Sequence, residues 1–345
     1  MVLAPCRYSV MNGTSYSSYL SDSCPAGLMD HWKDTIPNFQ APSFTSKIED
    51  YSKVYAYLPL EKLDVDRHVI NPHIHYHLAG KGALCLMTDR TTKLLTNTKD
   101  QRPCVAKVTH AMGSKGIFII ENDEDEQEFY DFLEESGNPN YVITEFVSIQ
   151  RNVACHFFIH PSGEITWIGS NENVLLPNGS WSTDSTIIMS DQEHLKDIQL
   201  PFVQDVARYA RKNGFWGFCG CDVLFDANGK GYLVDVNPRV TGTSPALMIA
   251  KLLEDEYGFG FGLFRRTSSC AYHGSQDALF REVKEYNEGN IGNSRVVLHS
   301  VYEKCGDSTA VNLGVYGNSL EECERVLNHF SPRPIAPVAP VPMIT

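Results

Sequence analysis

Residues 217–239 read GFCGCDVLFDANGKGYLVDVNPR, and this stretch decides the fold that we expect. Two runs rich in β-branched and aromatic residues flank the segment 226–231. That segment consists mainly of Asp, Asn and Gly, which tolerate the backbone angles of turns. The pattern therefore predicts a β-hairpin.

Three polar residues interrupt the two apolar runs of this hairpin: Asp222, Asp235 and Asn237. Asp235 and Asn237 are two positions apart, so both point to the same face of a strand. Two carboxylates and an amide oxygen are the ligands that Mg²⁺ takes when it also holds phosphates. The alternative is a hairpin with merely solvated acids, since polar residues at alternate strand positions are ordinary.

The composition excludes several classes of protein. A chain of 345 residues with 42% hydrophobic residues can form two or three lobes with cores of their own. Its formal net charge of −13 argues against a nucleic-acid partner, because phosphate backbones require basic surfaces. No apolar run approaches the roughly 20 residues that cross a bilayer, so we expect no membrane partner and a cytoplasmic location. The ten cysteines suit reduced thiols better than a disulfide framework.

The first third of the chain carries weaker signals. Residues 1–45 predict loops with little helix, and residues 54–58 predict a strand. His73, His75 and His77 would share one face of a strand and could hold a structural metal, but no fourth ligand is evident nearby, so an ordinary polar strand is the stronger interpretation. Residues 80–87, including Lys81, predict a helix.

Residues 103–120 predict a hairpin flap. A short apolar strand with Lys107 near its end leads into the glycine-containing loop 109–116, and residues 117–120 form a second strand. The small residues of the loop let backbone N–H groups approach an anion, and Lys107 can offer an ammonium group to phosphate. A hairpin tip with an unrelated lysine is the alternative.

The middle of the chain predicts a buried strand over residues 141–147 that contains Glu145 and could present backbone groups to a purine edge. A hairpin over residues 153–169 and a long polar loop over residues 170–192 follow, and the loop is long enough to act as a substrate lid. An amphipathic helix then runs from residue 195 to 209.

After Arg239 the sequence predicts a helix over residues 246–253, and strands over residues 295–302 and 309–316. A helix then begins at Ser319 with a capping box and runs to Phe330. The proline-rich residues 332–342 predict an extended or disordered tail.

This order of features, over about residues 75–255, resembles the ATP-grasp superfamily: a lysine before a glycine-bearing flap, an acid-ended strand, then GxxGxD followed by DVNPR. It is most similar to the carboxylate–amine ligases, relatives of D-alanine–D-alanine ligase and the L-amino-acid ligases. The resemblance implies a mixed α+β and α/β architecture in which two α+β lobes grip ATP. The implied segments are a short N-terminal region (1–75), a small lobe with the flap (76–148), a large lobe with the metal site (149–331) and the tail (332–345).

The resemblance also implies roles for individual residues. Lys107 and Arg239 would be catalytic, Lys107 at the phosphates and Arg239 at the acyl phosphate. Asp222, Asp235 and Asn237 would bind Mg²⁺ or Mn²⁺, as two ions. Asp235 stands where a glutamate is usual, and Asn152 stands where a ribose-binding glutamate is usual. The implied ATP contacts are Lys81, Lys107, Met112, Gly113, Ser114, Gly116, Glu145, Phe146, Val147 and Asn152.

The function that we expect from the sequence is ATP-dependent joining of a carboxylate, of an amino acid, to an amine, with release of ADP and phosphate. The partners would be these small molecules, and a homodimer is compatible with this expectation. Two alternatives stay open: a ligase with a thiol acceptor, and an ATP-binding module that does not catalyse.

Overall fold

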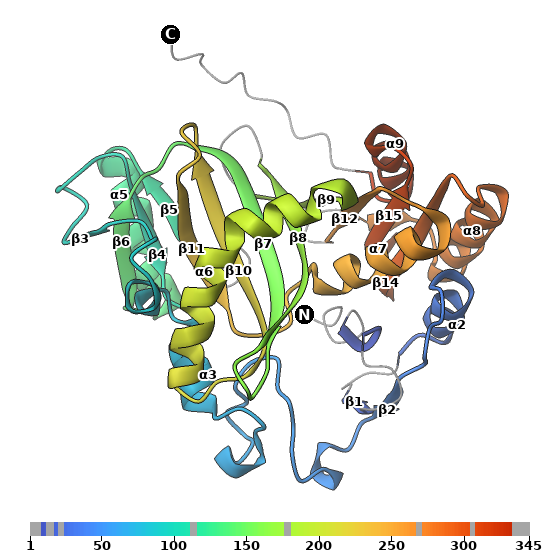
Figure 1. Cartoon of the computed structure of the whole chain (residues 1–345), viewed down its shortest axis with the longest axis horizontal. Helices are drawn as coiled ribbons and strands as arrows, with labels where there is room; N and C mark the ends of the chain where they lie inside the picture. Colours follow the sequence, from blue (N-terminus) through green and yellow to red (C-terminus); the bar gives the residue numbers. More distant parts are fainter. Residues whose placement is uncertain are drawn as a thin grey trace. The chain divides into compact units, whose positions relative to one another are not determined.

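The computed structural model describes residues 8–11, 17–19, 24–110, 116–175, 181–266, 271–303 and 308–332 (Figure 1). The chain divides into two compact units. The hairpin unit comprises Lys53–Ile168 and Leu195–Thr241, and the terminal unit comprises Met1–Ser52, Gly169–His194 and Gly242–Thr345. The expected tail and three of the expected flap contacts, Met112, Gly113 and Ser114, lie outside the described residues.

The smaller sheet of the hairpin unit has four antiparallel strands in the order β3(Leu94–Leu95), β6(Tyr141–Glu145), β4(Cys104–Val108), β5(Ile117–Ile120). Its apolar face packs with α5(Asp123–Ser136) in one core. Because side chains alternate along a strand, Lys107 and Thr144 lie on the opposite face from that core. The core residues are Cys104, Ala106, Val108, Ile120, Phe129 and Ile143.

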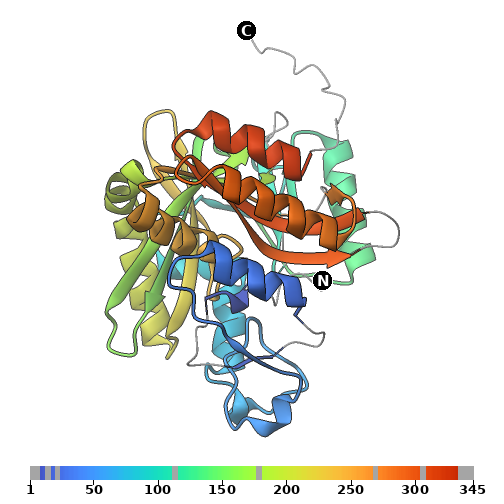
Figure 2. The same ribbon diagram turned by 90° about the vertical axis from the view of Figure 1, so that its right-hand side faces the viewer.

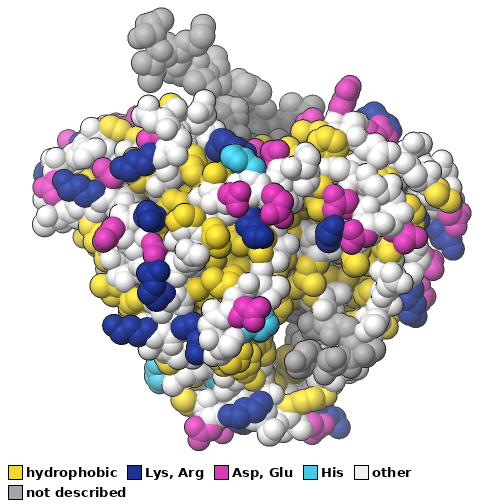
Figure 3. Space-filling view, in the orientation of Figure 1, with side chains coloured by type: hydrophobic (Ala, Val, Ile, Leu, Met, Phe, Trp, Pro, Cys, Tyr) yellow, Lys and Arg dark blue, Asp and Glu magenta, His cyan; other side chains and the backbone are white. Residues whose placement is uncertain are grey.

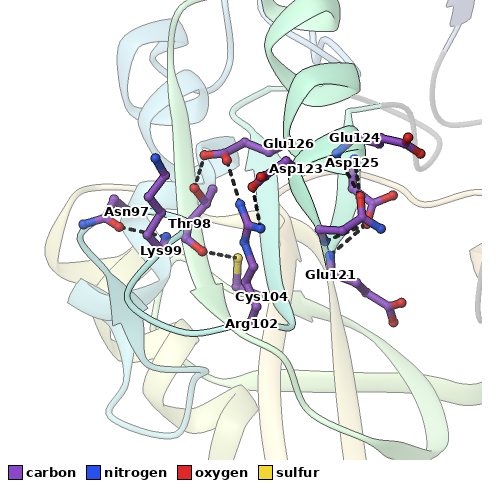
Figure 4. Close-up of polar contacts among 11 residues, drawn as sticks. Asn97, Thr98, Lys99, Arg102, Cys104, Glu121, Asp123, Glu124, Asp125 and Glu126 are labelled. Carbon is purple, nitrogen blue, oxygen red and sulfur yellow. Dashed lines mark hydrogen bonds and ion pairs between the residues drawn. The ribbon is translucent and has the colours of Figure 1, made fainter.

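The first turn of α5 is fixed by polar contacts, as Figure 4 shows. Asn122 caps the helix in a capping box with Asp125, and acidic residues make up the first turn of the helix. Arg102, just before β4, donates hydrogen bonds of 2.7 Å to both Asp123 and Glu126. These contacts tie the segment that enters β4 to the helix that covers it.

The larger sheet of the hairpin unit contains the predicted hairpin. Strands β10(Gly217–Asp226) and β11(Gly231–Asn237) pair antiparallel, and β10 also pairs with β7(Ile149–Ile159). At the turn, Asp226 accepts hydrogen bonds from the backbone N–H groups of Asn228 and Lys230, and Gly229 has a φ of 76°. The hairpin prediction is confirmed, and the turn is closed by the residue types that suggested it.

Helix α6(Gln192–Lys212) covers these strands from Leu195 onward. Its apolar stripe packs against the faces of β7, β10 and β11 that carry Cys155, Cys221 and Leu233 (Figure 1). The predicted amphipathic helix is confirmed, and it continues through Pro201. One face of the sheet is therefore sealed, and the opposite face carries the polar residues of the hairpin.

Two predictions for residues 53–87 are wrong. Residues 54–58 form only an isolated bridge between Val54 and His68, because the neighbouring segments are the short helix η2(Val65–Arg67) and loops. The three histidines lie on the helix α3(Pro72–Ala79), where Asn71 caps the N-terminus. A helical period puts His75 on a different face from its two neighbours, so it is buried while they are exposed. The predicted helix over 80–87 is present as η3(Lys81–Ala83) and α4(Leu84–Met87).

The terminal unit has a sheet in which β15(Ser308–Gly317) is central, pairing with β12(Phe261–Arg265), β13(Ala271–His273) and β14(Ser294–Glu303). Helices α8(Gln276–Gly289) and α9(Leu320–Phe330) pack on β14 and β15, and α2(Ala26–Thr35) packs on β14 (Figure 2). The strands predicted over 295–302 and 309–316 and the Ser319 cap are confirmed. The remaining elements of this unit are β1(Ser17–Tyr19), β2(Ser43–Thr45), η1(Ile48–Asp50), η4(Met189–Asp191) and α7(Ser244–Tyr257).

Two loop predictions in this unit are also wrong. Residues 170–192 belong largely to β8(Ile165–Leu175) and β9(Trp181–Ile188), which pair with each other, and not to a polar lid. Polar side chains such as those of Asn171 and Ser185 are buried in these strands. The sequence therefore lacks the apolar residues that usually indicate a buried strand. The N-terminal segment contains α2, whose Trp32 is fully buried and donates to the carbonyl of Leu298 at 2.7 Å.

None of the helices in the described part of the chain is long and apolar enough to cross a membrane. On the face of the molecule in Figure 3, acidic and basic side chains are interspersed with hydrophobic ones.

Candidate active site

The polar face of the hairpin brings together the three expected metal ligands. Asp222 and Asp235 are direct partners across β10 and β11, and Asn237 stands opposite Gly220 two pairs further along. The register shifts after Asp222, so the strand is irregular next to this carboxylate. All three side chains therefore lie on the open face of the sheet, opposite the core sealed by α6.

A chain of hydrogen bonds runs along this face. The Lys81 ammonium group, on η3, forms an ion pair with the Asp235 carboxylate. Asn237 donates through Nδ2 to Asp235 Oδ2 at 3.3 Å, and Arg239 donates through Nη2 to Asn237 Oδ1 at 2.7 Å. Lys81 and Arg239 thus contact the two ends of one polar network.

Lys107 approaches the same network from the small sheet. It is buried, with 7% of its surface exposed, and its Nζ lies 3.5 Å from the carbonyl oxygen of Val234. Burial and, to a lesser extent, the neighbouring Lys81 lower the pKa of Lys107 to about 8, against the opposing effect of the Asp235 and Asp222 carboxylates. An anionic ligand that binds beside this buried lysine would favour its charged form.

Both lysines line one small pocket of the hairpin unit. Thr92 and Thr144 also line it, each is 5% exposed, and neither hydroxyl has a hydrogen-bond partner in the part of the chain that the structure describes. A buried hydroxyl without a partner costs free energy, so these two groups point to a ligand that hydrogen-bonds inside the pocket. The other lining residues are Leu84, Cys85, Thr91, Leu94 and Val142.

The remaining expected nucleotide contacts lie at the edges of the two sheets. Glu145 ends β6, and its Oε1 accepts a hydrogen bond of 3.0 Å from the backbone N–H of Lys93. Phe146 and Val147 follow it in the connection to β7. Asn152 is buried on β7 opposite Leu224. Gly116 closes the described end of the flap, where its carbonyl accepts from the Val108 N–H at 2.8 Å.

The donor set on the hairpin is compatible with Mg²⁺. Within the described ranges, no group of three or more His, Cys, Asp or Glu side chains is arranged to hold a metal ion. The hairpin offers two carboxylates that face one another, together with an amide oxygen, all hard oxygen donors. His75, by contrast, is held neutral: burial, with smaller effects of Arg239 and His68, lowers its pKa to about 4. The weak metal hypothesis for the three histidines gains no support.

Sequence reasoning missed several residues around this site. Tyr57 accepts a hydrogen bond of 2.5 Å from Arg239 Nη1. Thr241 is hydrogen-bonded to His156 Nδ1 at 2.7 Å, which fixes the chain just beyond Arg239. No signal in the sequence links Tyr57 to a residue 182 positions away. Thr144 does carry a sequence signal, because it is a polar residue in an apolar strand.

Comparison with solved structures gives the fold. The chain has an ATP-grasp fold, so the predicted fold class and resemblance are confirmed. N5-carboxyaminoimidazole ribonucleotide synthetase in its ADP complex is similar, with a TM-score of 0.53, 12% identity and coverage of 77% of each chain. L-amino acid ligase from Bacillus licheniformis has a TM-score of 0.51 and 11% identity over 74% of this chain and 71% of that one.

The family comparison is more specific. Residues 87–237, less than half of the chain, match the family model described as L-aspartate–L-methionine ligase, ATP grasp. The matched segment includes Lys107 and the three expected metal ligands, and it ends before Arg239. The comparison with curated proteins found no match.

A biotin carboxylase domain from Hydrogenobacter thermophilus is also similar in structure, with a TM-score of 0.50, 13% identity and coverage of 73% of this chain. This chain spans 65% of the length of that domain. At these identities the solved structures establish the fold alone.

Proposed function

We propose that the protein is an ATP- and Mg²⁺-dependent ligase that activates the carboxylate of an amino acid as an acyl phosphate and joins it to an amine. The observation that supports this most directly is the approach of two lysines, Lys81 and Lys107, to the carboxylates of Asp222 and Asp235. Phosphoryl transfer depends mainly on positioning and charge neutralisation, and this arrangement offers both. The match to an amino-acid ligase family adds support.

The proposed reaction has two steps. A carboxylate oxygen of the substrate attacks the γ-phosphorus of ATP, and the bond to the β-phosphate oxygen breaks to release ADP. The amine nitrogen then attacks the acyl carbon, phosphate leaves with the original carboxylate oxygen, and the amine loses a proton. The acyl phosphate formed from ATP drives formation of the amide bond, and no group is oxidised or reduced.

The residues of the chain would act on charge and orientation. Lys107 and Lys81 would offset the negative charge of the phosphates in the pocket that both of them line. Arg239 would bind oxygens of the acyl phosphate, because its planar fork holds two at once. Asp222, Asp235 and Asn237 would hold Mg²⁺, which when bound neutralises phosphate charge.

Thr92 and Thr144 would hydrogen-bond the nucleotide inside the pocket. Their buried hydroxyls otherwise lack partners among the described residues. The same proposal includes two metal ions, Mg²⁺ or Mn²⁺. It also includes a homodimer and a cytoplasmic location.

The name of the matched family suggests the first substrates to test, L-aspartate and L-methionine. We propose an amide between two L-amino acids as the product class. Incubation with ATP, Mg²⁺ and this pair, followed by pools of single amino acids, should give equal amounts of ADP and amide by liquid chromatography with mass spectrometry. Formation of AMP and pyrophosphate alone would contradict the mechanism.

Asp222→Asn provides the test at the level of a residue. The variant should lose at least about a hundredfold in turnover with an unchanged circular dichroism spectrum, because one carboxylate of the metal site is gone. Asp197→Asn, an exposed aspartate on α6, is the matched control and should keep full activity. Full activity of Asp222→Asn would remove Asp222 from the site.

The two alternatives give different outcomes in the same assays. A carboxylate–thiol ligase would form a hydroxamate with hydroxylamine but no amide with any amine, and would form a thioester with a thiol acceptor. A module that binds without catalysis would bind ATP in calorimetry and form no ADP with any mixture.

A further inference from the structure

Tyr57 contacts the guanidinium of Arg239 in two ways, through its hydroxyl and through its ring. Arg239 donates from Nη1 to the Tyr57 hydroxyl at 2.5 Å, and its Cζ lies 4.7 Å from the centre of the tyrosine ring. The same side chain therefore offers the guanidinium both an acceptor and an aromatic face. Arginine side chains have several rotatable bonds, and two contacts from one ring restrict them strongly.

The other contacts of Arg239 complete the restraint. Nη2 donates to Asn237 Oδ1 at 2.7 Å, and Nη1 also approaches the carbonyl of Val240 at 3.4 Å. Beyond it, Thr241 is hydrogen-bonded to His156 on β7. The chain two residues beyond Arg239 is thus tied to β7, and the Arg239 guanidinium is contacted by Asn237 on one side and by Tyr57 on the other.

Tyr57 comes from a different part of the chain, the segment between Lys53 and the helix α3. That segment is irregular, yet it is fixed to the large sheet at a second tyrosine. The Tyr55 hydroxyl accepts a hydrogen bond of 3.0 Å from the Phe218 backbone N–H, at the start of β10. Burial raises the pKa of Tyr55 to about 12. Tyr55 thus anchors the segment, and Tyr57, two residues on, reaches the arginine.

We infer that Tyr57 is a positioning residue that orients the Arg239 guanidinium for the reacting carboxylate. This inference rests on the proposed function for the reaction, while the restraint on Arg239 is a property of the structure alone. Tyr57 acts through the arginine and need not touch the substrate. Preorganised groups lose most of their value when their supporting contact is removed, so the effect should fall on turnover more than on ATP binding.

The test compares Tyr57→Phe, Tyr57→Leu and the matched control Tyr55→Phe. Tyr57→Phe keeps the aromatic face and removes only the hydroxyl; it should lower kcat about tenfold and leave the KM for ATP within about twofold, as expected for loss of one hydrogen bond to a charged group. Tyr57→Leu should lower kcat further. Tyr55→Phe removes a hydroxyl from the same segment without touching Arg239 and should keep kcat, even if thermal stability falls.

A second measurement reads the arginine directly. In protein labelled with ¹³C and ¹⁵N at arginine, rotation of the Arg239 guanidinium should be slow in the wild type and faster in Tyr57→Phe, with no change in Tyr55→Phe. An unchanged kcat in Tyr57→Phe, or unchanged guanidinium rotation, would overturn the inference. Absence of ADP formation by the wild type with every substrate would instead overturn the proposed function, and the rotation measurement would still decide whether Tyr57 holds Arg239.

Discussion

Lys81 and Asp235, separated by 154 residues of sequence, form an ion pair on the open face of the hairpin. The lysine side chain is 9% exposed and the aspartate 24%, so both charges are largely removed from water. Such a pair is stable only while each charge has a partner. Asp235 therefore has a cationic partner from the chain itself, and a bound metal ion would have to share that carboxylate with Lys81.

Lys107→Met should make the protein more stable and less active. The folded pKa of Lys107 is about 8, below the value near 10.5 of the unfolded chain. Between these values the unfolded chain binds more protons, so the stability of the wild type rises with pH through this window. The variant lacks this rise and should be more stable at pH 7, by on the order of 1–3 kcal/mol.

Urea unfolding at pH 7 and at pH 10.5 measures this difference, which should shrink toward zero at the higher pH. ADP formation should fall at least about a hundredfold. Lys99→Met, on the exposed surface of the same lobe, is the control and should change neither quantity. A loss of stability in Lys107→Met at pH 7 would show that the buried lysine does not destabilise the folded protein.

Thr144→Val and Thr92→Val should weaken ATP binding while leaving the fold at least as stable. Valine has nearly the shape of threonine and removes a buried hydroxyl that lacks a partner among the described residues, so unfolding should cost up to about 1 kcal/mol more. The dissociation constant for ATP, measured by calorimetry, should rise about tenfold. Unchanged ATP affinity in both variants would exclude these hydroxyls from nucleotide binding.

Asp184→Asn should destabilise the terminal unit severely. Arg265 is 1% exposed and donates to Asp184 from Nε at 2.9 Å and from Nη2 at 2.8 Å. Removal of the carboxylate leaves a buried guanidinium uncompensated, which costs about 3–5 kcal/mol. In urea unfolding, the double variant Asp184→Leu/Arg265→Met should lose less than the sum of its single variants. Strict additivity would show that the two charges do not depend on each other.

Gly220→Ala should disturb Arg239 through Thr241, which lies two residues beyond the arginine. A Cβ at Gly220 would stand 2.5 Å from Thr241 Cγ2, so Thr241 would have to leave its position beside His156. We expect a loss of about 1–3 kcal/mol in unfolding free energy and a lower kcat. Gly260→Ala, where a Cβ would meet nothing within 4 Å, is the control and should be nearly neutral. Wild-type kcat in Gly220→Ala would show that Arg239 tolerates movement of the chain beyond it.

Local patterns predicted most of the fold around the hairpin. The turn residues of the segment 226–231, the period of α6 and the Ser319 cap of α9 are properties of short segments, and each corresponds to an element of the structure. The predictions failed where burial depends on distant partners. The polar strands β8 and β9 have the residue pattern of a loop, because residues such as Ser185 hydrogen-bond to the neighbouring strand, to Asn173 at 3.3 Å, rather than to water.

The candidate site also contains features that local spacing predicts and contacts that it does not. Asp235 and Asn237 could be grouped from their spacing, because a strand has a fixed period. The contact of Lys81 with Asp235, and that of Tyr57 with Arg239, depend on how segments far apart in sequence pack, and no local pattern records them. The alternate spacing of the three histidines predicts a strand, but they lie on the helix α3, because the cap at Asn71 and the packing of His75 decide the local structure.

The central claim is transfer of phosphate to a carboxylate, and oxygen isotope transfer tests it most directly. The protein is incubated with ATP, Mg²⁺ and a pair of amino acids that supports turnover, with ¹⁸O in the carboxyl groups of one partner at a time. An acyl phosphate requires that one labelled oxygen per turnover appears in the released phosphate, from one of the two partners only, with ADP as the nucleotide product. Label in AMP, or unlabelled phosphate with either labelled partner, would contradict the account.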